Sequence, residues 1–159
     1  MLTIQIICIG KIKENYLKDA ITEYSKRLSK YCKLNIVELA DEKIPEKLNE
    51  NISHEIKKKE CDSMLKYIKK DSHIICLDLK GKQFSSEDFS SHLQDLSMQT
   101  SNITFVIGGS LGMTEEFLQQ SQEKICFSKM TFPHQLIRVF LLEQIFRAFK
   151  ISNGETYHR

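Results

Sequence analysis

The residues best suited to chemistry lie in the run 127–134, Phe-Ser-Lys-Met-Thr-Phe-Pro-His. An apolar stretch ends near Phe127 and a helical pattern starts at Pro133, so the run predicts a loop between a strand and a helix. Free backbone amides and carbonyls in such a loop can hydrogen-bond an adenine edge, while Met130 and Phe132 can contact the ring. An ordinary strand-to-helix connection with core side chains explains the same residues, and on the pattern alone that interpretation comes first.

A second pattern is the glycine-rich run 108–112, Gly-Gly-Ser-Leu-Gly, which follows an apolar stretch. Glycines let the backbone turn sharply and approach a ligand closely, and open α/β sheets bind ligands at the carboxyl ends of their strands. The run is neither the dinucleotide fingerprint G-x-G-x-x-G nor a P-loop, because no G-K-[ST] follows it. By itself it indicates a plain turn about as well as a ligand loop.

The third pattern is the chain end 154–159, which contains Tyr157, His158 and Arg159. Tyrosine and histidine can stack on bases and arginine can bind phosphate, although a solvated chain end explains these residues equally well. None of the five histidines is paired with a cysteine or a second histidine at a metal-ligand spacing, so we expect no metal site.

Composition places these patterns in one folded domain, residues 1–159, with 41% hydrophobic and 28% charged residues. The five cysteines form no C-x-x-C pair, no apolar stretch approaches the ~18 residues of a membrane span, and the N-terminus lacks the basic start of a signal peptide. We therefore expect a cytoplasmic protein with no membrane partner.

Net charge is only +2, but its distribution is uneven. Residues 11–70 hold fifteen basic and eleven acidic side chains, residues 71–127 three and eight, and residues 128–159 five and two. Basic ends fit an RNA partner, although solvated helix faces are the simpler explanation from charge alone.

Strand and helix patterns alternate along the chain, which predicts an α/β fold with a parallel sheet flanked by helices. Apolar runs predict strands over residues 2–9, 34–39, 74–79, 103–107 and 125–127. The third strand is expected to close with a turn at 80–82. Apolar steps of three and four predict helices over 14–31, around 52–68, around 89–96, after Thr114, and over about 133–151.

The last of these helices is apolar around most of its circumference. Such a surround means burial on several sides, either within the monomer or against a partner chain. Because other helices are already available to cover the sheet, we favour a subunit interface over a central core helix.

Several segments together resemble the ribosomal large-subunit RNA methyltransferase H family, a SPOUT-class family. They span the whole chain and comprise residues 4–10, the 107–112 loop, the 127–135 run, Arg138, 143–148 and 154–158. The two long motifs are specific, and we would not expect them together by chance.

The resemblance implies a SPOUT-type fold with a deep C-terminal trefoil knot that forms the pocket for the cofactor S-adenosyl-L-methionine. It implies a homodimer in which the pocket is completed near the partner chain. It also implies N3-methylation of a pseudouridine in 23S rRNA on the assembled ribosome.

The resemblance assigns cofactor binding to eight positions: Leu77, Gly108, Phe127, Ser128, Lys129, Met130, Thr131 and Phe132. One departure is Leu111, because a small polar residue is common there in the family. For catalysis, which needs removal of the N3 proton, we select His158 as base or base contact and Arg138 as a cation for phosphate or the developing anion. His134 and Arg159 remain further candidates.

Three other functions stay open at this point. One is a SPOUT enzyme that acts on a tRNA base, which the lack of an added RNA-binding domain disfavours. The second is a non-catalytic RNA-binding dimer, and the third is a nicotinamide-dependent enzyme, which the missing dinucleotide fingerprint disfavours.

Overall fold

The computed structural model describes residues 1–158. Its ten elements alternate strictly along the chain. They are β1 (Thr3–Ile9), α1 (Asn15–Leu28), β2 (Lys33–Leu39), α2 (Glu50–Leu65), β3 (His73–Lys82), α3 (Ser86–Gln99), β4 (Asn102–Ile107), α4 (Glu115–Gln120), β5 (Glu123–Ile125) and α5 (His134–Ser152).

The five strands form one parallel sheet in the order β2-β1-β4-β3-β5. The α/β prediction with a parallel sheet is therefore confirmed. Parallel pairing brings the carboxyl ends of all five strands to one edge, where the loops after β1, β3, β4 and β5 meet.

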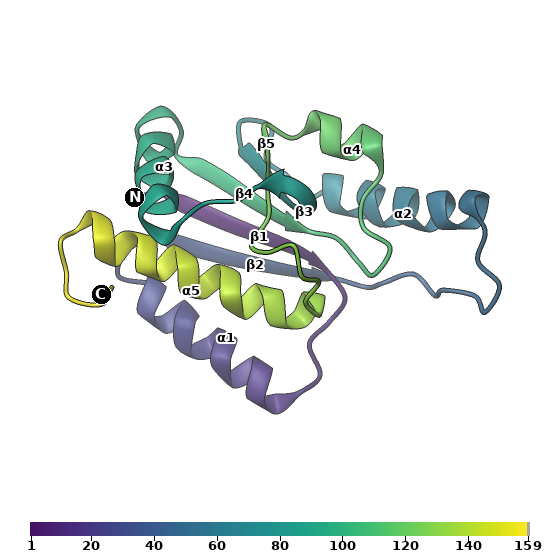
Figure 1. Ribbon diagram of the computed structural model, residues 1–159, viewed down its shortest axis with the longest axis horizontal. Helices are drawn as coiled ribbons and strands as arrows, with labels where there is room; N and C mark the ends of the chain where they lie inside the picture. The colour runs from purple at the N-terminus through teal and green to yellow at the C-terminus, as the bar shows by residue number, and fades with distance from the viewer. Residues whose placement is uncertain (159) are drawn as a thin grey trace.

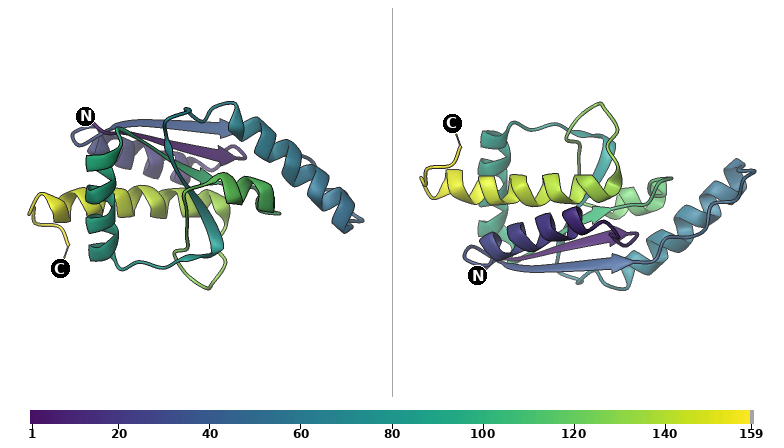
Figure 2. Two further views of the ribbon diagram at one scale, coloured as in Figure 1. Left: turned by 90° about the horizontal axis from the view of Figure 1, so that it is seen from above. Right: turned by 90° about the horizontal axis from the view of Figure 1, so that it is seen from below.

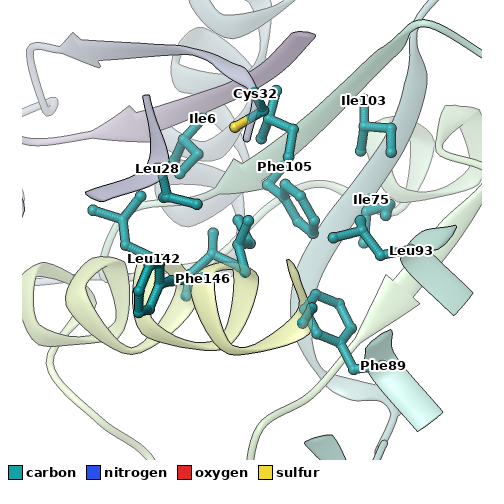
Figure 3. Close-up of a cluster of buried hydrophobic side chains, with 14 of the residues drawn as sticks. Ile6, Leu28, Cys32, Ile75, Phe89, Leu93, Ile103, Phe105, Leu142 and Phe146 are labelled. Atoms are coloured by element: carbon teal, nitrogen blue, oxygen red, sulfur yellow. The ribbon is translucent and has the colours of Figure 1, made fainter. Parts of the chain in front are cut away.

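Helices cover both faces of this sheet, as Figures 1 and 2 show, with α1 and α5 side by side over one face and α2 and α4 over the other. Side chains alternate accordingly along β1, because Ile4, Ile6 and Cys8 enter the core beneath α1, α3 and α5. Ile7 and Ile9 enter the core beneath α2 and α4. Figure 3 shows the larger core, where α5 packs onto the sheet.

The predicted turn at 80–82 is wrong, because β3 continues to Lys82. The strand shifts register between Leu77 and Lys82 and then pairs again with Ile125 of β5. Gly81 makes this crossing possible, since a Cβ there would lie 2.5 Å from the backbone carbon of Ile125. The fifth strand correspondingly ends at Ile125 rather than at Phe127.

Helix α5 is to a large extent a core helix of the monomer. It packs against α1 and α3, and it buries Leu141, Leu142 and Ile145 completely. Its apolar circumference is thus largely explained without a partner chain. Phe140 is the apolar side chain of α5 that stays most exposed, at 37%.

Candidate functional site

A cavity of about 700 Å³ lies at the carboxyl edge of the sheet. Its walls come from residues 77–79 in the middle of β3, the loop after β4, the loop after β5 and the first turn of α5. These segments are far apart in sequence, and the parallel sheet brings them together. The volume is in the range of pockets that hold cofactors and other small ligands.

Seven of the eight residues that the resemblance assigns to cofactor binding line this cavity. They are Leu77, Gly108, Phe127, Ser128, Met130, Thr131 and Phe132. Lys129 is exposed and does not line the cavity. Leu111, the departure from the family pattern, also faces this space.

The loop after β5 supplies main-chain polar groups because residues 126–133 form neither helix nor strand. Its start is fixed by the Cys126 N–H, which donates to the Lys82 carbonyl at 2.9 Å. Its middle is shaped by the Met130 N–H, which donates to Ser128 Oγ at 3.0 Å. Phe132 packs edge-on against Phe140 of α5, with ring centroids 5.4 Å apart, and this contact anchors its far end.

The glycine loop after β4 folds closely on itself. The Gly112 N–H donates to the Gly109 carbonyl at 3.0 Å, and Gly112 has a φ of +85°, which disfavours other residues. A Cβ on Gly108 would lie 2.9 Å from Met113 Cγ. The glycines therefore keep the loop thin where it borders the cavity.

Glu60 of α2 supports this loop from behind, and the sequence alone gave no sign of it. Its carboxylate is buried, accepts the Glu42 N–H at 3.0 Å, and occupies the space where a Cβ on Gly109 would come within 2.8 Å. Burial raises the pKa of Glu60 against the opposing hydrogen bond from the Glu42 N–H, and the Asp41 and Glu42 carboxylates raise it further. Only a three-dimensional contact across about fifty residues reveals this neighbour.

His134 is the titratable side chain of the cavity wall with a perturbed pKa. Burial lowers the pKa of His134 below its ordinary value of 6.5, and the Arg138 charge lowers it further against a smaller opposing effect of Asp41. The imidazole is therefore mostly neutral near pH 7 and able to accept a proton. His134 is therefore a titratable group on the wall of the cavity.

Arg138, the expected catalytic cation, lies outside the cofactor-sized cavity of its own chain. Its side chain is 1% exposed and does not line the cofactor-sized cavity. Nη1 donates to Glu38 at 2.8 Å, and Nη2 donates to the Ile9 and Gly10 carbonyls at 2.8 and 2.7 Å. Four of its five N–H groups lie on these two nitrogens, so the guanidinium ties α5 to the ends of β1 and β2.

His158 also lies outside the cavity of its own chain. Its Nδ1 is 3.1 Å from Arg147 Nη1, and its Nε2 is 2.5 Å from the Glu87 carboxylate at the start of α3. Arg147 in turn donates to Glu143, which also accepts the Tyr157 hydroxyl. The tail is thus held in a polar network along α5, while Arg159 lies outside the described residues.

The structure also bears on the cysteines, on metal ligands and on membrane-spanning helices. All five cysteines are buried and unpaired, and burial raises the pKa of Cys8 to about 12. Within residues 1–158, no group of three His, Cys, Asp or Glu side chains is arranged to hold a metal ion. No helix in that part of the chain is long and apolar enough to cross a membrane.

The cavity fits the cofactor that the resemblance implies. Adenine needs flat apolar walls and main-chain hydrogen-bonding groups, and the loop after β5 provides both. The glycines of the 108–112 loop let a ligand approach the backbone without meeting a Cβ.

A family model described as "Predicted SPOUT methyltransferase" matches residues 2–158. The chain belongs to the SPOUT methyltransferase family. Relatives from Clostridium acetobutylicum and Clostridium tetani, each named "Ribosomal RNA large subunit methyltransferase H", are 57% and 56% identical to it over 159 residues. Each match covers 99% of this chain and 100% of the relative.

Solved structures support the SPOUT fold independently. The A. aeolicus TrmH/SpoU tRNA modifying enzyme superposes with a TM-score of 0.52 at 14% identity, over 95% of this chain and 77% of that one. A probable methylase family protein from Haemophilus influenzae gives 0.52 at 13%, over 98% and 70%. At these identities the likeness concerns the fold alone.

Proposed function

We propose that this SPOUT methyltransferase transfers a methyl group from S-adenosyl-L-methionine to N3 of a pseudouridine in 23S rRNA on the assembled ribosome. The observation that carries the proposal is the cavity of about 700 Å³, where seven of the eight residues expected to bind cofactor converge. The full-length relatives named for large-subunit rRNA methylation support the substrate class.

The cofactor, when bound, supplies a methyl group already activated by a sulfonium charge. The protein then mainly has to orient the acceptor nitrogen, and such orientation contributes roughly 7–11 kcal/mol in favourable systems. Leu77, Phe127 and Phe132 exclude water from one side of the cavity. Main-chain groups of residues 127–132 fix the position of the bound cofactor. These residues bind and position, and none of them has to change its protonation state.

The acceptor N3–H must lose its proton as the new N–C bond forms. His134 is suited to receive it, because its imidazole lines the cavity and burial favours the neutral form. We therefore place His134 beside His158 as a candidate base.

For His158, the proposal requires a second subunit. Because it does not line the cavity of its own chain, it would have to act on the cavity of a partner protomer. The homodimer is thus part of the proposal, and the half-exposed Phe140 next to the cavity loop is consistent with a partner packing there. The deep trefoil knot belongs to the proposal as well, supported by membership of the family.

The deciding experiment incubates the protein with ribosomes that lack the modification and with methyl-labelled cofactor, then maps the label by mass spectrometry of RNA fragments. We expect label on one pseudouridine of 23S rRNA in 70S particles and little on protein-free rRNA. Label on tRNA, or on protein-free rRNA but not on particles, would contradict the proposed substrate. Absence of heat on titration with cofactor would contradict methyl transfer altogether.

A further inference from the structure

A second concave site lies at the same edge of the sheet as the cofactor cavity, on the α1 side. This basic cleft, of about 640 Å³, is lined by Lys11, Lys18, Ile21, Ile36, Glu38 and Arg138. Lys11 follows β1, Glu38 is near the end of β2, and Lys18 is in the first turns of α1. None of these positions belongs to the cofactor cavity.

The first turns of α5 separate the two sites. His134 and Ile137 face the cofactor cavity, while Arg138 and Leu142 face the basic cleft. A ligand that lies across the end of α5 can therefore occupy both at once. A polynucleotide has this shape, because successive nucleotides can enter neighbouring pockets while the backbone passes between them.

Charge in the basic cleft favours an anion. Arg138 and Glu38 neutralise each other through their 2.8 Å contact. Lys11 and Lys18 are exposed and, among the described residues, have no acidic partner within ion-pair distance. Two exposed lysines that line one cleft suit a phosphate group.

The cleft also has an apolar part. Ile6, Ile12, Ile21 and Ile36 supply an apolar wall of the kind against which a planar base can pack. Arg138 also lines the cleft, and its buried Nε–H has no hydrogen-bond partner among residues 1–158. An apolar wall together with two lysines that have no acidic partner in the described part of the chain matches the base and phosphate of one nucleotide.

We propose that the basic cleft binds a nucleotide of the RNA substrate that neighbours the methylated one, with its phosphate between Lys11 and Lys18 and its base against the isoleucines. This inference rests on the proposed function for the identity of the RNA. It adds a second recognition site on the same protomer, outside the cofactor cavity.

The main test compares Lys11→Gln/Lys18→Gln with the matched control Lys26→Gln/Lys33→Gln, which removes the same charge from the far end of α1 and the start of β2. We expect the cleft variant to raise the KM for ribosomes about tenfold, and to reduce the slope of log KM against log salt by about 1.5 for two lost phosphate contacts. The Kd for cofactor, measured by calorimetry, should stay within twofold of wild type. The control should change neither the KM nor the slope beyond twofold.

Two outcomes would overturn the proposal. One is a KM and salt slope equal to those of the control variant. The other is dissociation of an oligomer in sedimentation by the cleft variant alone, which would assign the surface to protein contact. The variant Thr22→Phe narrows the cleft while keeping its charge, and we expect it to raise the KM as well.

A binding assay separates this proposal from the proposed function. Uridine trinucleotide titrated into the wild-type protein should shift backbone amide resonances around Lys11 and Lys18, and the shifts should vanish in the double variant. If wild-type protein fails to methylate ribosomes but still shows these shifts, the proposed function fails and the cleft assignment stands. If methylation succeeds and neither the shifts nor the KM depends on these lysines, the cleft assignment fails alone.

Discussion

His134 and Arg138 are two basic side chains near the start of α5, and their surroundings give them different roles. They stand four residues apart on α5, but only His134 faces the cofactor cavity. Burial lowers the pKa of His134, whereas Arg138 is held by a carboxylate and two carbonyls. His134 is thus placed to exchange a proton with a ligand in the cofactor cavity, whereas the guanidinium of Arg138 joins α5 to the ends of β1 and β2.

Replacing His134 with Gln should lower methyl transfer to ribosomes about 100-fold, because a general base typically contributes factors of 10² or more. In the wild type, kcat/KM should fall as pH drops through a midpoint below 6.5, where the imidazole becomes protonated. The Gln variant should lack this acidic limb and keep its affinity for cofactor within a few-fold. A limb that persists unchanged in the variant would assign the titration to another group.

Because the folded pKa of His134 is lowered, the unfolded chain binds more protons just below pH 6.5. The free energy of unfolding should therefore fall as pH drops below 6.5, and this part of the decline should be absent in the Gln variant.

Replacing Arg138 with Met should lower the free energy of unfolding by about 3 kcal/mol, because the buried carbonyls of Ile9 and Gly10 lose their donor. Urea denaturation monitored by circular dichroism measures this change. Arg138→Lys should recover part of the loss, since a lysine keeps the charge with fewer donors. A fully stable Met variant that is nevertheless inactive would restore the catalytic role expected from the sequence.

At the scale of the elements, apolar periodicity was sufficient to predict the five strands and the five helices, with ends that differ mostly by a few residues. Such patterns are visible in the spacing of apolar residues within each segment. The continuation of β3 through Gly81 was not predictable, because a Lys-Gly-Lys sequence usually marks a turn, and the strand persists only through its pairing with Ile125. The contact of Glu60 with Gly109 was not predictable either, because it joins residues that are far apart in the sequence.

The same distinction between local patterns and contacts made by the fold applies to the candidate site. The residues around the cavity were identified through a family resemblance, whereas composition and spacing left an ordinary loop as the first choice for 127–134. The contacts of Arg138 could not be predicted, because an arginine near a candidate pocket gives the same sequence pattern whichever way its side chain points. Its direction follows from the helix register of α5 against β1, which no local pattern contains.

Replacing Gly81 with Ala tests how β3 and β5 position the cofactor loop. The new Cβ would lie 2.5 Å from the Ile125 backbone, which cannot rotate away, so β5 must move. We expect a loss of about 3 kcal/mol in unfolding free energy and at least tenfold weaker cofactor binding, measured by denaturation and calorimetry. Gly154→Ala is the control, since its Cβ would meet nothing within 4 Å and only its φ of +66° opposes the change, by about 1 kcal/mol.

For the whole molecule, the main question is whether the catalytic groups gather in one chain or in two. The cofactor cavity, His134 and the basic cleft all lie at the carboxyl edge of the sheet. His158 is instead held by Arg147 and Glu87, outside that cavity. If His158 contributes to catalysis, the geometry requires a partner chain, and the oligomer becomes part of the active site.

Co-expression of two inactive variants tests this requirement. His158→Ala keeps the cavity intact, while Gly108→Val blocks it, because a Cβ there would lie 2.9 Å from Met113. If the tail acts across the dimer, a mixed dimer contains one complete site, and random pairing should restore about one quarter of the wild-type methylation. If His158 acted within its own chain, each protomer of the mixed dimer would lack one component, and the mixture would stay as inactive as its parts. Full activity of His158→Ala alone would remove this histidine from the mechanism and leave His134 as the base.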